Sequence, residues 1–154
     1  MPEFQAKARL QRMSSEAFGS DLVVRSMTDD GSFRVLTART TDLCREALRR
    51  QSAVGETRRH FADLLTGTVL VRETMAPTLR VQGIVRGDGG GCTLIGDSFP
   101  DGGTRGLVTC KSGVEQITFG GDSLMQFMRT LPNGSVHRGV EGLSRTRAVD
   151  SARR

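Results

Sequence analysis

Tryptophan and tyrosine are absent from this chain of 154 residues, and phenylalanine occurs only seven times. Leucine, valine, methionine and these phenylalanines therefore have to fill the interior. The chain also lacks any run of about 18 apolar residues, so we expect no segment to span a membrane. Its first residues lack the apolar stretch of a secretory signal peptide. These absences predict a cytoplasmic protein that does not act at a membrane.

Residues that bind metals are scarce. The chain has three cysteines, Cys44, Cys92 and Cys110, and two histidines, His60 and His137. None of them forms a Cys-x-x-Cys, Cys-x-Cys or paired histidine motif, and a structural zinc site needs about four such ligands. We therefore expect no metal and no other cofactor. In a reducing cytosol the three cysteines are expected to be free thiols, although Cys92 and Cys110 fall on separate predicted strands that could be neighbours.

Positive charge is not concentrated in the part of the chain that is expected to fold. The formal net charge is +5, of which residues 1–20 carry +1, residues 144–154 carry +3 and residues 21–143 only +1. A nucleic-acid-binding domain usually gathers basic residues on its folded face. Nucleic acid is therefore not the expected partner, and an Arg-rich regulatory or nucleic-acid-binding module is kept only as an alternative.

Two motifs suggest catalysis or phosphate binding, and neither has the residues that such chemistry needs. The segment 121–124 spells Gly-Asp-Ser-Leu, an esterase signature, but a serine nucleophile needs an oriented base and neither histidine lies in an Asp-x-x-His motif. The glycine-rich segment 87–91 lacks Gly-Lys-Ser/Thr and a following helix. We expect turns at both places, no enzyme, and no catalytic or cofactor-binding residues.

The coarse pattern along the chain predicts an α+β fold. Two β-branched runs flank Asp30-Gly31, which indicates an N-terminal hairpin. Two amphipathic helices follow, the first capped by Thr40 or Thr41 and ending near residue 51, the second covering 56–72. Short runs separated by glycine-rich turns then predict an antiparallel meander, with strands over 78–86, 92–96, 104–111, 115–119, 124–131 and 135–140.

These elements divide the chain into three parts. Residues 1–20 are predicted to be a disordered leader, and the polar residues 144–154 a disordered tail. Residues 21–143 are predicted to form one domain. Its second helix should bury a stripe at i, i+3, i+4 spacing formed by Phe61, Leu64, Leu65, Thr68 and Val69.

The order of these segments resembles the redox-regulated thirty-three-kilodalton heat-shock chaperone family. The resemblance covers roughly residues 21–143. It is carried by segment 33–51 for the first strands and helix, segment 61–70 for the second helix, segment 79–83 at the start of the sheet, and segments 104–108 and 124–140 within it. The last of these contains Met-Arg-Thr-Leu-Pro-Asn-Gly.

The resemblance implies a holdase chaperone, which binds unfolding client proteins through exposed apolar surface without ATP. It also implies a metastable linker and a four-cysteine zinc domain, and neither is found in these 154 residues. After Gly83 the chain also departs from the family pattern, which puts the first sheet hairpin in question. We therefore expect a truncated chaperone domain that lacks the zinc switch, with a non-functional remnant as the alternative. The client-binding residues stay unassigned.

The end of the predicted sheet suggests self-association. Segment 135–140 has no following strand to cover it, and residues 124, 125, 127, 128 and 131 cannot all be buried on one face of a strand. We expect the isolated chain to self-associate, in addition to binding unfolded clients.

Overall fold

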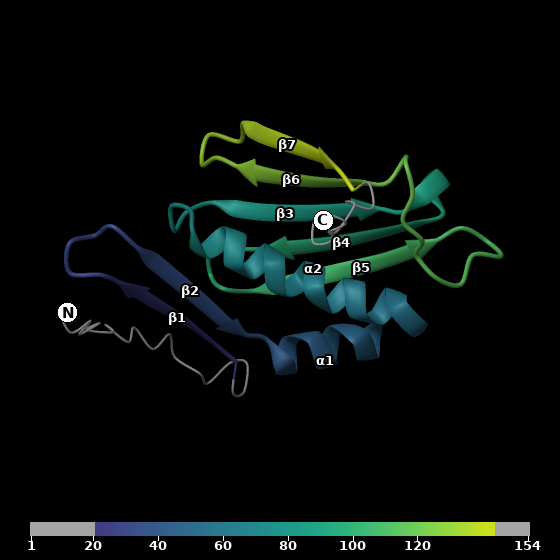
Figure 1. Ribbon diagram of the computed structural model, residues 1–154, viewed down its shortest axis with the longest axis horizontal. Helices are drawn as coiled ribbons and strands as arrows, with labels where there is room; N and C mark the ends of the chain where they lie inside the picture. Colours follow the sequence, from purple (N-terminus) through teal and green to yellow (C-terminus); the bar gives the residue numbers. More distant parts are fainter. Residues whose placement is uncertain (1–20, 144–154) are drawn as a thin grey trace, which may run out of the picture.

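A computed structural model describes residues 21–143 and confirms the α+β fold. An N-terminal hairpin, two helices and a five-stranded antiparallel sheet follow one another along the chain, and Figure 1 shows both helices on one side of that sheet. The predicted leader and tail, residues 1–20 and 144–154, lie outside the described residues.

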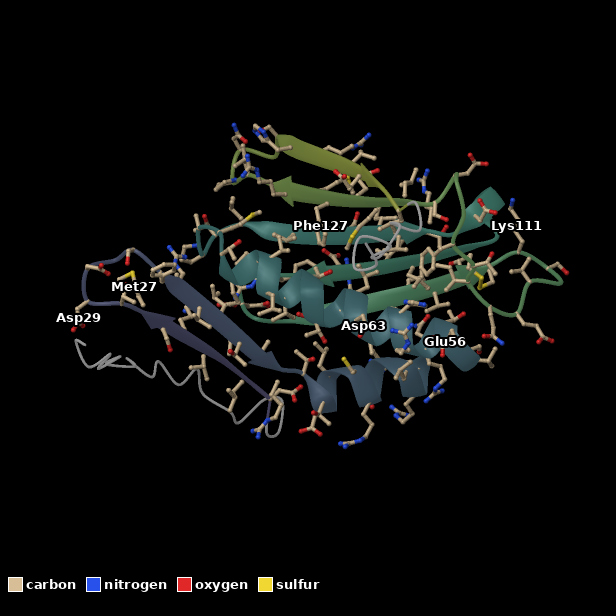
Figure 2. The ribbon with its side chains drawn as sticks, in the orientation of Figure 1. Met27, Asp29, Glu56, Asp63, Lys111 and Phe127 are labelled. Atoms are coloured by element: carbon tan, nitrogen blue, oxygen red, sulfur yellow. A yellow bond between two sulfur atoms is a disulfide. The ribbon has the colours of Figure 1, made fainter. Side chains whose placement is uncertain are left out.

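The hairpin pairs β1 (Leu22–Met27) with β2 (Arg34–Arg39) and matches its prediction. At the tip, near Met27 and Asp29 in Figure 2, the Asp30 carboxylate accepts hydrogen bonds from the hydroxyls of Thr28 at 2.5 Å and Ser32 at 2.7 Å. These bonds lower the pKa of Asp30 to about 2. Gly31 has φ of 71°, a left-handed conformation that glycine adopts without strain.

The helices α1 (Thr41–Arg50) and α2 (Gly55–Glu73) lie within one or two residues of their predicted bounds. Thr40 occupies the N-cap position, one of the two residues predicted for it, but its side chain makes no capping hydrogen bond. The Asp21 carboxylate instead accepts the backbone N–H groups of Asp42 at 3.0 Å and Leu43 at 2.7 Å. The carboxylate just before β1 thus accepts hydrogen bonds from backbone N–H groups at the start of α1, which have no partner within the helix.

The large sheet has the strand order β5-β4-β3-β6-β7. All its pairs are antiparallel, as predicted, but a simple meander describes only its first three strands. The long connection after β5 returns the chain to the other side of β3, which therefore lies at the centre. The strands are β3 (Arg80–Arg86), β4 (Cys92–Ser98), β5 (Thr104–Cys110), β6 (Leu124–Thr130) and β7 (Val136–Gly142).

The first sheet hairpin, β3 with β4, is complete despite the departure from the family pattern. Its connection is a short 3-10 turn, η1 (Asp88–Gly90), so the glycine-rich segment 87–91 forms the turn predicted for it. The Lys111 ammonium group donates a hydrogen bond to the Gly89 carbonyl at 3.0 Å, which links this turn to the end of β5.

A row of glycines brings α2 close to the sheet. Gly106, Gly96 and Gly83 lie opposite one another on β5, β4 and β3. A Cβ atom at Gly106 would lie 2.5 Å from the Phe61 ring, and one at Gly83 or Gly96 would lie 2.8 Å from the Thr68 hydroxyl. Because no side chains intervene, α2 packs directly on the backbone of three strands.

The core lies between α2 and this face of the sheet. The predicted α2 stripe is buried, except that Val69 is only half-buried. The predicted strand over 115–119 is wrong, because that segment crosses the start of α2 as a loop and pairs with no described strand. Its Ile117 N–H donates to the Thr57 hydroxyl at 2.8 Å. The buried cluster consists of Phe61, Leu64, Leu65, Val85, Cys92, Leu94 and Ile117.

Candidate functional site

Among residues 21–143, α2 covers one face of the five-stranded sheet and no helix or strand covers the other. Because side chains alternate along each strand, the residues between the helix-facing glycines point away from α2. No element among residues 21–143 packs on this second side, which we call the open face. Its members by strand and register are Arg80, Gln82, Ile84, Arg86, Thr93, Ile95, Asp97, Arg105, Leu107, Thr109, Leu124, Gln126, Met128, Thr130, Val136, Arg138 and Val140.

An aliphatic row crosses the middle of the open face. Leu107, Ile95 and Ile84 lie directly opposite one another on β5, β4 and β3, and the row continues through Gln126 to Val140 on β7. Leu107 is 48% exposed and Val140 58%, whereas the three residues between them are half-buried by their neighbours. Leu107, Ile95 and Ile84 form the contiguous aliphatic part of the row, and exposed apolar surface of this kind can serve as a binding site.

A charged cluster borders the row at one end of the sheet. Asp97 is buried although it points to the open face, because two arginines cover it. Arg80 binds its carboxylate through two hydrogen bonds of 2.7 and 2.6 Å, and Arg105 binds it at 3.2 Å. The Asp97 carboxylate raises the pKa of Arg80, chiefly through these hydrogen bonds. Both guanidinium groups also lie about 5 Å from the Phe99 ring, at 5.0 and 4.9 Å.

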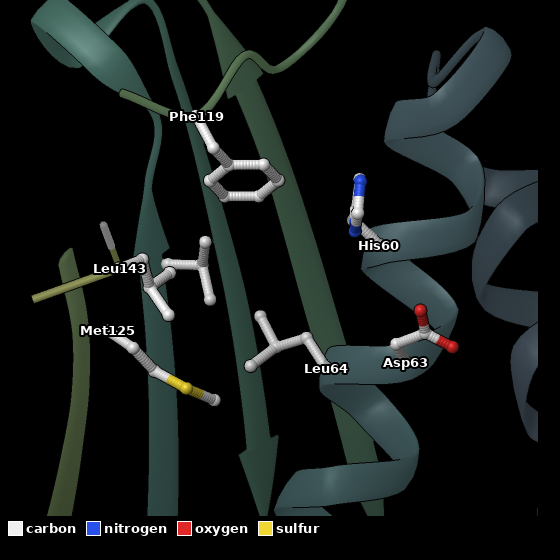
Figure 3. Close-up of a pocket in the computed structure, with 7 residues that line it drawn as sticks. His60, Asp63, Leu64, Phe119, Met125 and Leu143 are labelled. Atoms are coloured by element: carbon white, nitrogen blue, oxygen red, sulfur yellow. The ribbon is translucent and has the colours of Figure 1, made fainter. Parts of the chain in front are cut away.

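A second concave site lies on the helix side of the sheet. Figure 3 shows His60 of α2 next to Phe119 and the apolar side chains from the sheet and the loops, while the Asp63 carboxylate on the same helix points away from them. The cavity measures about 400 Å³, and the His60 ring meets the Phe119 ring edge-on with centroids 4.8 Å apart. It can accommodate an apolar side chain. Its lining consists of His60, Asp63, Leu64, Val85, Phe119, Met125 and Leu143.

The serine and the two histidines that were considered for catalysis lie on different elements of the domain. Ser123 is buried, and its hydroxyl accepts the Gly120 N–H at 2.9 Å, so the Gly-Asp-Ser-Leu segment forms the predicted turn before β6. His60 lies at the rim of the apolar cavity, and His137 is exposed on β7. Phe127 points to the helix side, where it packs over Gly83.

The prediction of three free thiols is wrong for two of them. Cys92 and Cys110 lie directly opposite each other on β4 and β5 and form a disulfide. Cys44 is a free thiol, half-buried on α1, with its sulfur 3.7 Å from the Ala62 carbonyl oxygen. The sequence indicated that Cys92 and Cys110 lie on separate strands, but it did not reveal how the two strands pair. The register of that pairing decides whether the two cysteines can form a disulfide.

Reduction of this disulfide should lower the free energy of unfolding by about 3 kcal/mol, because the bond closes a loop between residues 18 apart in sequence. Urea unfolding with and without a thiol reductant measures the change. A Cys92→Ser/Cys110→Ser variant should unfold like the reduced parent and ignore the reductant, and Cys44→Ser should respond as the parent does. An unfolding curve of the parent that reductant leaves in place would contradict the prediction.

Comparison with known proteins assigns most of the chain to one family. The sequence profile of the family described as Hsp33 protein matches residues 21–147, most of the chain. The chain belongs to the Hsp33 family. Curated relatives include two proteins named 33 kDa chaperonin, one from Listeria welshimeri serovar 6b at 29% identity and one from Listeria monocytogenes serotype 4a at 30%, each over 90 residues. The match covers 58% of this chain and 31% of each relative.

The Hsp33 family is a family of chaperones and not a known class of enzyme. The resemblance to this family also implied a zinc site, and the residues of the described domain do not fit one. Across 21–143 no three histidine, cysteine, aspartate or glutamate side chains gather closely enough to hold a metal ion. Neither helix in this range has the length and apolar character needed to cross a membrane.

Proposed function

We propose that this chain is an ATP-independent holdase that binds unfolded or aggregation-prone proteins in the cytoplasm. The observation that carries the proposal is the aliphatic row on the open face, which no described element covers. An unfolded client exposes apolar side chains, and their burial against the row would contribute roughly 25 cal/mol for each Å² removed from water. Family membership supports the same function.

The proposed holdase needs no zinc release to act. In this proposal the open face is accessible to clients at all times, because the described domain has neither a metal site nor an element over that face. Charged groups at the border, Arg86 and the cluster at Asp97, keep the surface hydrated around the apolar row. Client binding therefore depends on shape and apolar area and not on the redox state of a metal centre.

Replacing the three aliphatic side chains of the row by threonine should weaken client binding about tenfold, which corresponds to about 1.4 kcal/mol. The variant is Ile84→Thr/Ile95→Thr/Leu107→Thr, and threonine is β-branched, which suits a strand. The measurement is light scattering by a chemically unfolded client, with increasing amounts of chaperone. The parent should suppress this aggregation without prior oxidation.

A matched control removes three exposed aliphatic side chains elsewhere, in Leu22→Thr/Val35→Thr/Val54→Thr. This control should suppress aggregation as well as the parent does. Equal loss in both triple variants would show that no particular surface binds the client. A parent that leaves aggregation unchanged would refute the holdase proposal itself.

A further inference from the structure

The open face has an excess of positive charge. Its charged members are four arginines, Arg80, Arg86, Arg105 and Arg138, and one carboxylate, Asp97, so the face has a formal net charge of +3. All residues from 21 to 143 together carry +1, so the remainder of the domain carries −2. The sheet thus separates charge in a way that the order of residues along the chain does not reveal.

Solvent meets the arginines of this face and not its carboxylate. The Asp97 side chain is 4% exposed because Arg80 and Arg105 bind it, whereas the Arg105 side chain is 70% exposed and that of Arg80 is 38% exposed. Arg86 and Arg138 are exposed and form no ion pair within the described domain. The surface offered to a partner is therefore cationic as well as apolar, and its guanidinium groups are suited to bind carboxylates.

The arginines lie at a fixed spacing from the aliphatic row. Three members of the row have an arginine two positions away on their own strand, in the pairs Ile84 with Arg86, Leu107 with Arg105, and Val140 with Arg138. Residues two apart on a strand point to the same side and lie about 7 Å from each other. Arg105 and Arg138 flank one side of the row, and Arg86 flanks the other. The same apolar and cationic pair is thus repeated on three strands.

We propose that the open face prefers unfolded clients of negative charge, in which an apolar side chain and a carboxylate lie two residues apart. This preference rests on the proposed holdase function and adds charge to apolar area as a determinant of binding. An extended client segment that lies roughly along the strands of the sheet repeats the same spacing of about 7 Å. Its apolar side chain can contact Ile84, Leu107 or Val140 while its carboxylate reaches the neighbouring guanidinium group.

Single-stranded nucleic acid fits this face less well than an acidic polypeptide does. Sheets that bind RNA stack its bases on exposed aromatic rings, and none of the members of the open face is aromatic. Phe99 lies just beyond the end of β4, and its ring already contacts the guanidinium groups of Arg80 and Arg105 at 5.0 and 4.9 Å. The aliphatic row instead suits the apolar side chains of a polypeptide.

Labelled peptides test the preference with the full chain. Three of them repeat Leu-Thr-X-Thr four times, with glutamate, glutamine or lysine at X, so that leucine and X lie on the same side of an extended strand. Fluorescence anisotropy measures the dissociation constants. The glutamate peptide should bind about tenfold more tightly than the lysine peptide, with the glutamine peptide between them, and high salt should reduce the difference.

A fourth peptide tests the spacing itself. It repeats Leu-Glu-Thr-Thr, which has the composition of the glutamate peptide but places leucine and glutamate on opposite sides of an extended strand. It should bind several-fold more weakly than the first glutamate peptide. Equal binding of the two would refute the match between the client and the arginines that neighbour the row.

Charge reversal on the face supplies the matching variant. Arg86→Glu/Arg138→Glu changes the net charge of the face from +3 to −1 and leaves the aliphatic row intact. It should bind the lysine peptide more tightly than the glutamate peptide, a gain that loss of the fold does not produce. The control Arg34→Glu/Arg58→Glu changes the net charge of the chain equally, at exposed positions on the hairpin and α2. It should keep the order of the parent.

The outcomes separate the charge preference from the holdase function. Equal binding of the glutamate, glutamine and lysine peptides would overturn the preference and leave the holdase function standing, whereas a parent that binds none of them would refute both. A reversed order in the control variant would overturn the preference as well, because net charge and not the face would then decide binding. Single-stranded polyuridine that displaces the glutamate peptide more effectively than unlabelled peptide does would assign the face to nucleic acid.

Discussion

Replacing Gly106 by valine is expected to destabilise the domain by roughly 3–5 kcal/mol, at or above the upper end for overpacking. The reason is the direct contact between α2 and the sheet. A Cβ at this position would lie 2.5 Å from the Phe61 ring and 2.8 Å from Leu65 Cδ2, and both side chains are fully buried. Neither can move without displacing α2 from the three strands beneath it. Urea unfolding monitored by circular dichroism measures the change.

Gly67→Ala is the matched control, because it adds one methyl group to a glycine on α2 with nothing within 4 Å. It should stabilise the helix by up to about 1 kcal/mol. A second check shortens the opposing side chain. Gly106→Ala combined with Phe61→Leu should cost less than the sum of the single changes, since leucine leaves room for the new methyl group. Strict additivity of the two changes would argue against the contact.

These glycines show where sequence reasoning stops. The chain has 12 glycines in the 39 residues from Gly83 to Gly121, a density typical of turns. Several do form turns, such as those of η1. Gly83, Gly96 and Gly106 instead lie in the middle of strands, and only the register of β3, β4 and β5 shows that they share one row under α2. Local composition cannot distinguish a glycine needed for a turn from one needed for close packing.

Local signals predicted the elements well, and long-range contacts account for the errors. The Asp30-Gly31 turn and the stripe from Phe61 to Thr68 are encoded by neighbouring residues, so the hairpin and α2 were predicted. Segment 115–119 has the composition of a strand, yet its Gln116 side chain accepts the Glu56 N–H at the start of α2 at 3.1 Å. Contacts between residues 60 apart in the chain leave no local pattern.

The candidate site was predicted only in part. The apolar residues of β6 indicated that one face could not bury them all, and the structure places Met125 and Phe127 toward α2 and Leu124 and Met128 on the open face. The aliphatic row itself depends on the order β5-β4-β3-β6-β7, which the predicted meander did not contain. Strand order is set by the connection between β5 and β6, and its path follows from tertiary packing.

A buried ion network that the sequence did not indicate joins the hairpin to α2. Glu73, the last residue of α2, forms ion pairs with Arg72 on the same helix and with Arg25 on β1. The Glu73 side chain is 2% exposed and that of Arg72 is 6%, whereas Arg25 is 38% exposed. The Nε of Arg72 has no hydrogen-bond partner among the described residues. The carboxylate is therefore the counter-charge that keeps a buried guanidinium in place.

Glu73→Gln is expected to destabilise the domain by about 3–5 kcal/mol, because it leaves a buried arginine without its counter-charge. It should also free the hairpin, since Arg25 loses its ion pair with α2. Amide hydrogen exchange should therefore rise in β1 and β2 more than in β3 and β4, and urea unfolding measures the total loss. Replacing both buried partners, in Arg72→Leu/Glu73→Leu, should cost less than Glu73→Leu alone, since no unpaired buried charge remains.

Glu46→Gln is the control that separates burial from charge. Glu46 also binds two arginines, Arg49 at 2.8 Å and Arg50 at 2.5 Å, but all three side chains lie on the exposed face of α1. The hydrogen bonds from Arg49 and then Arg50 lower the pKa of Glu46 to about 2. Solvent nevertheless screens an exposed pair, so its loss should leave the melting temperature nearly unchanged. If Glu46→Gln and Glu73→Gln lowered stability equally, desolvation of the network at Glu73 could not be the cause.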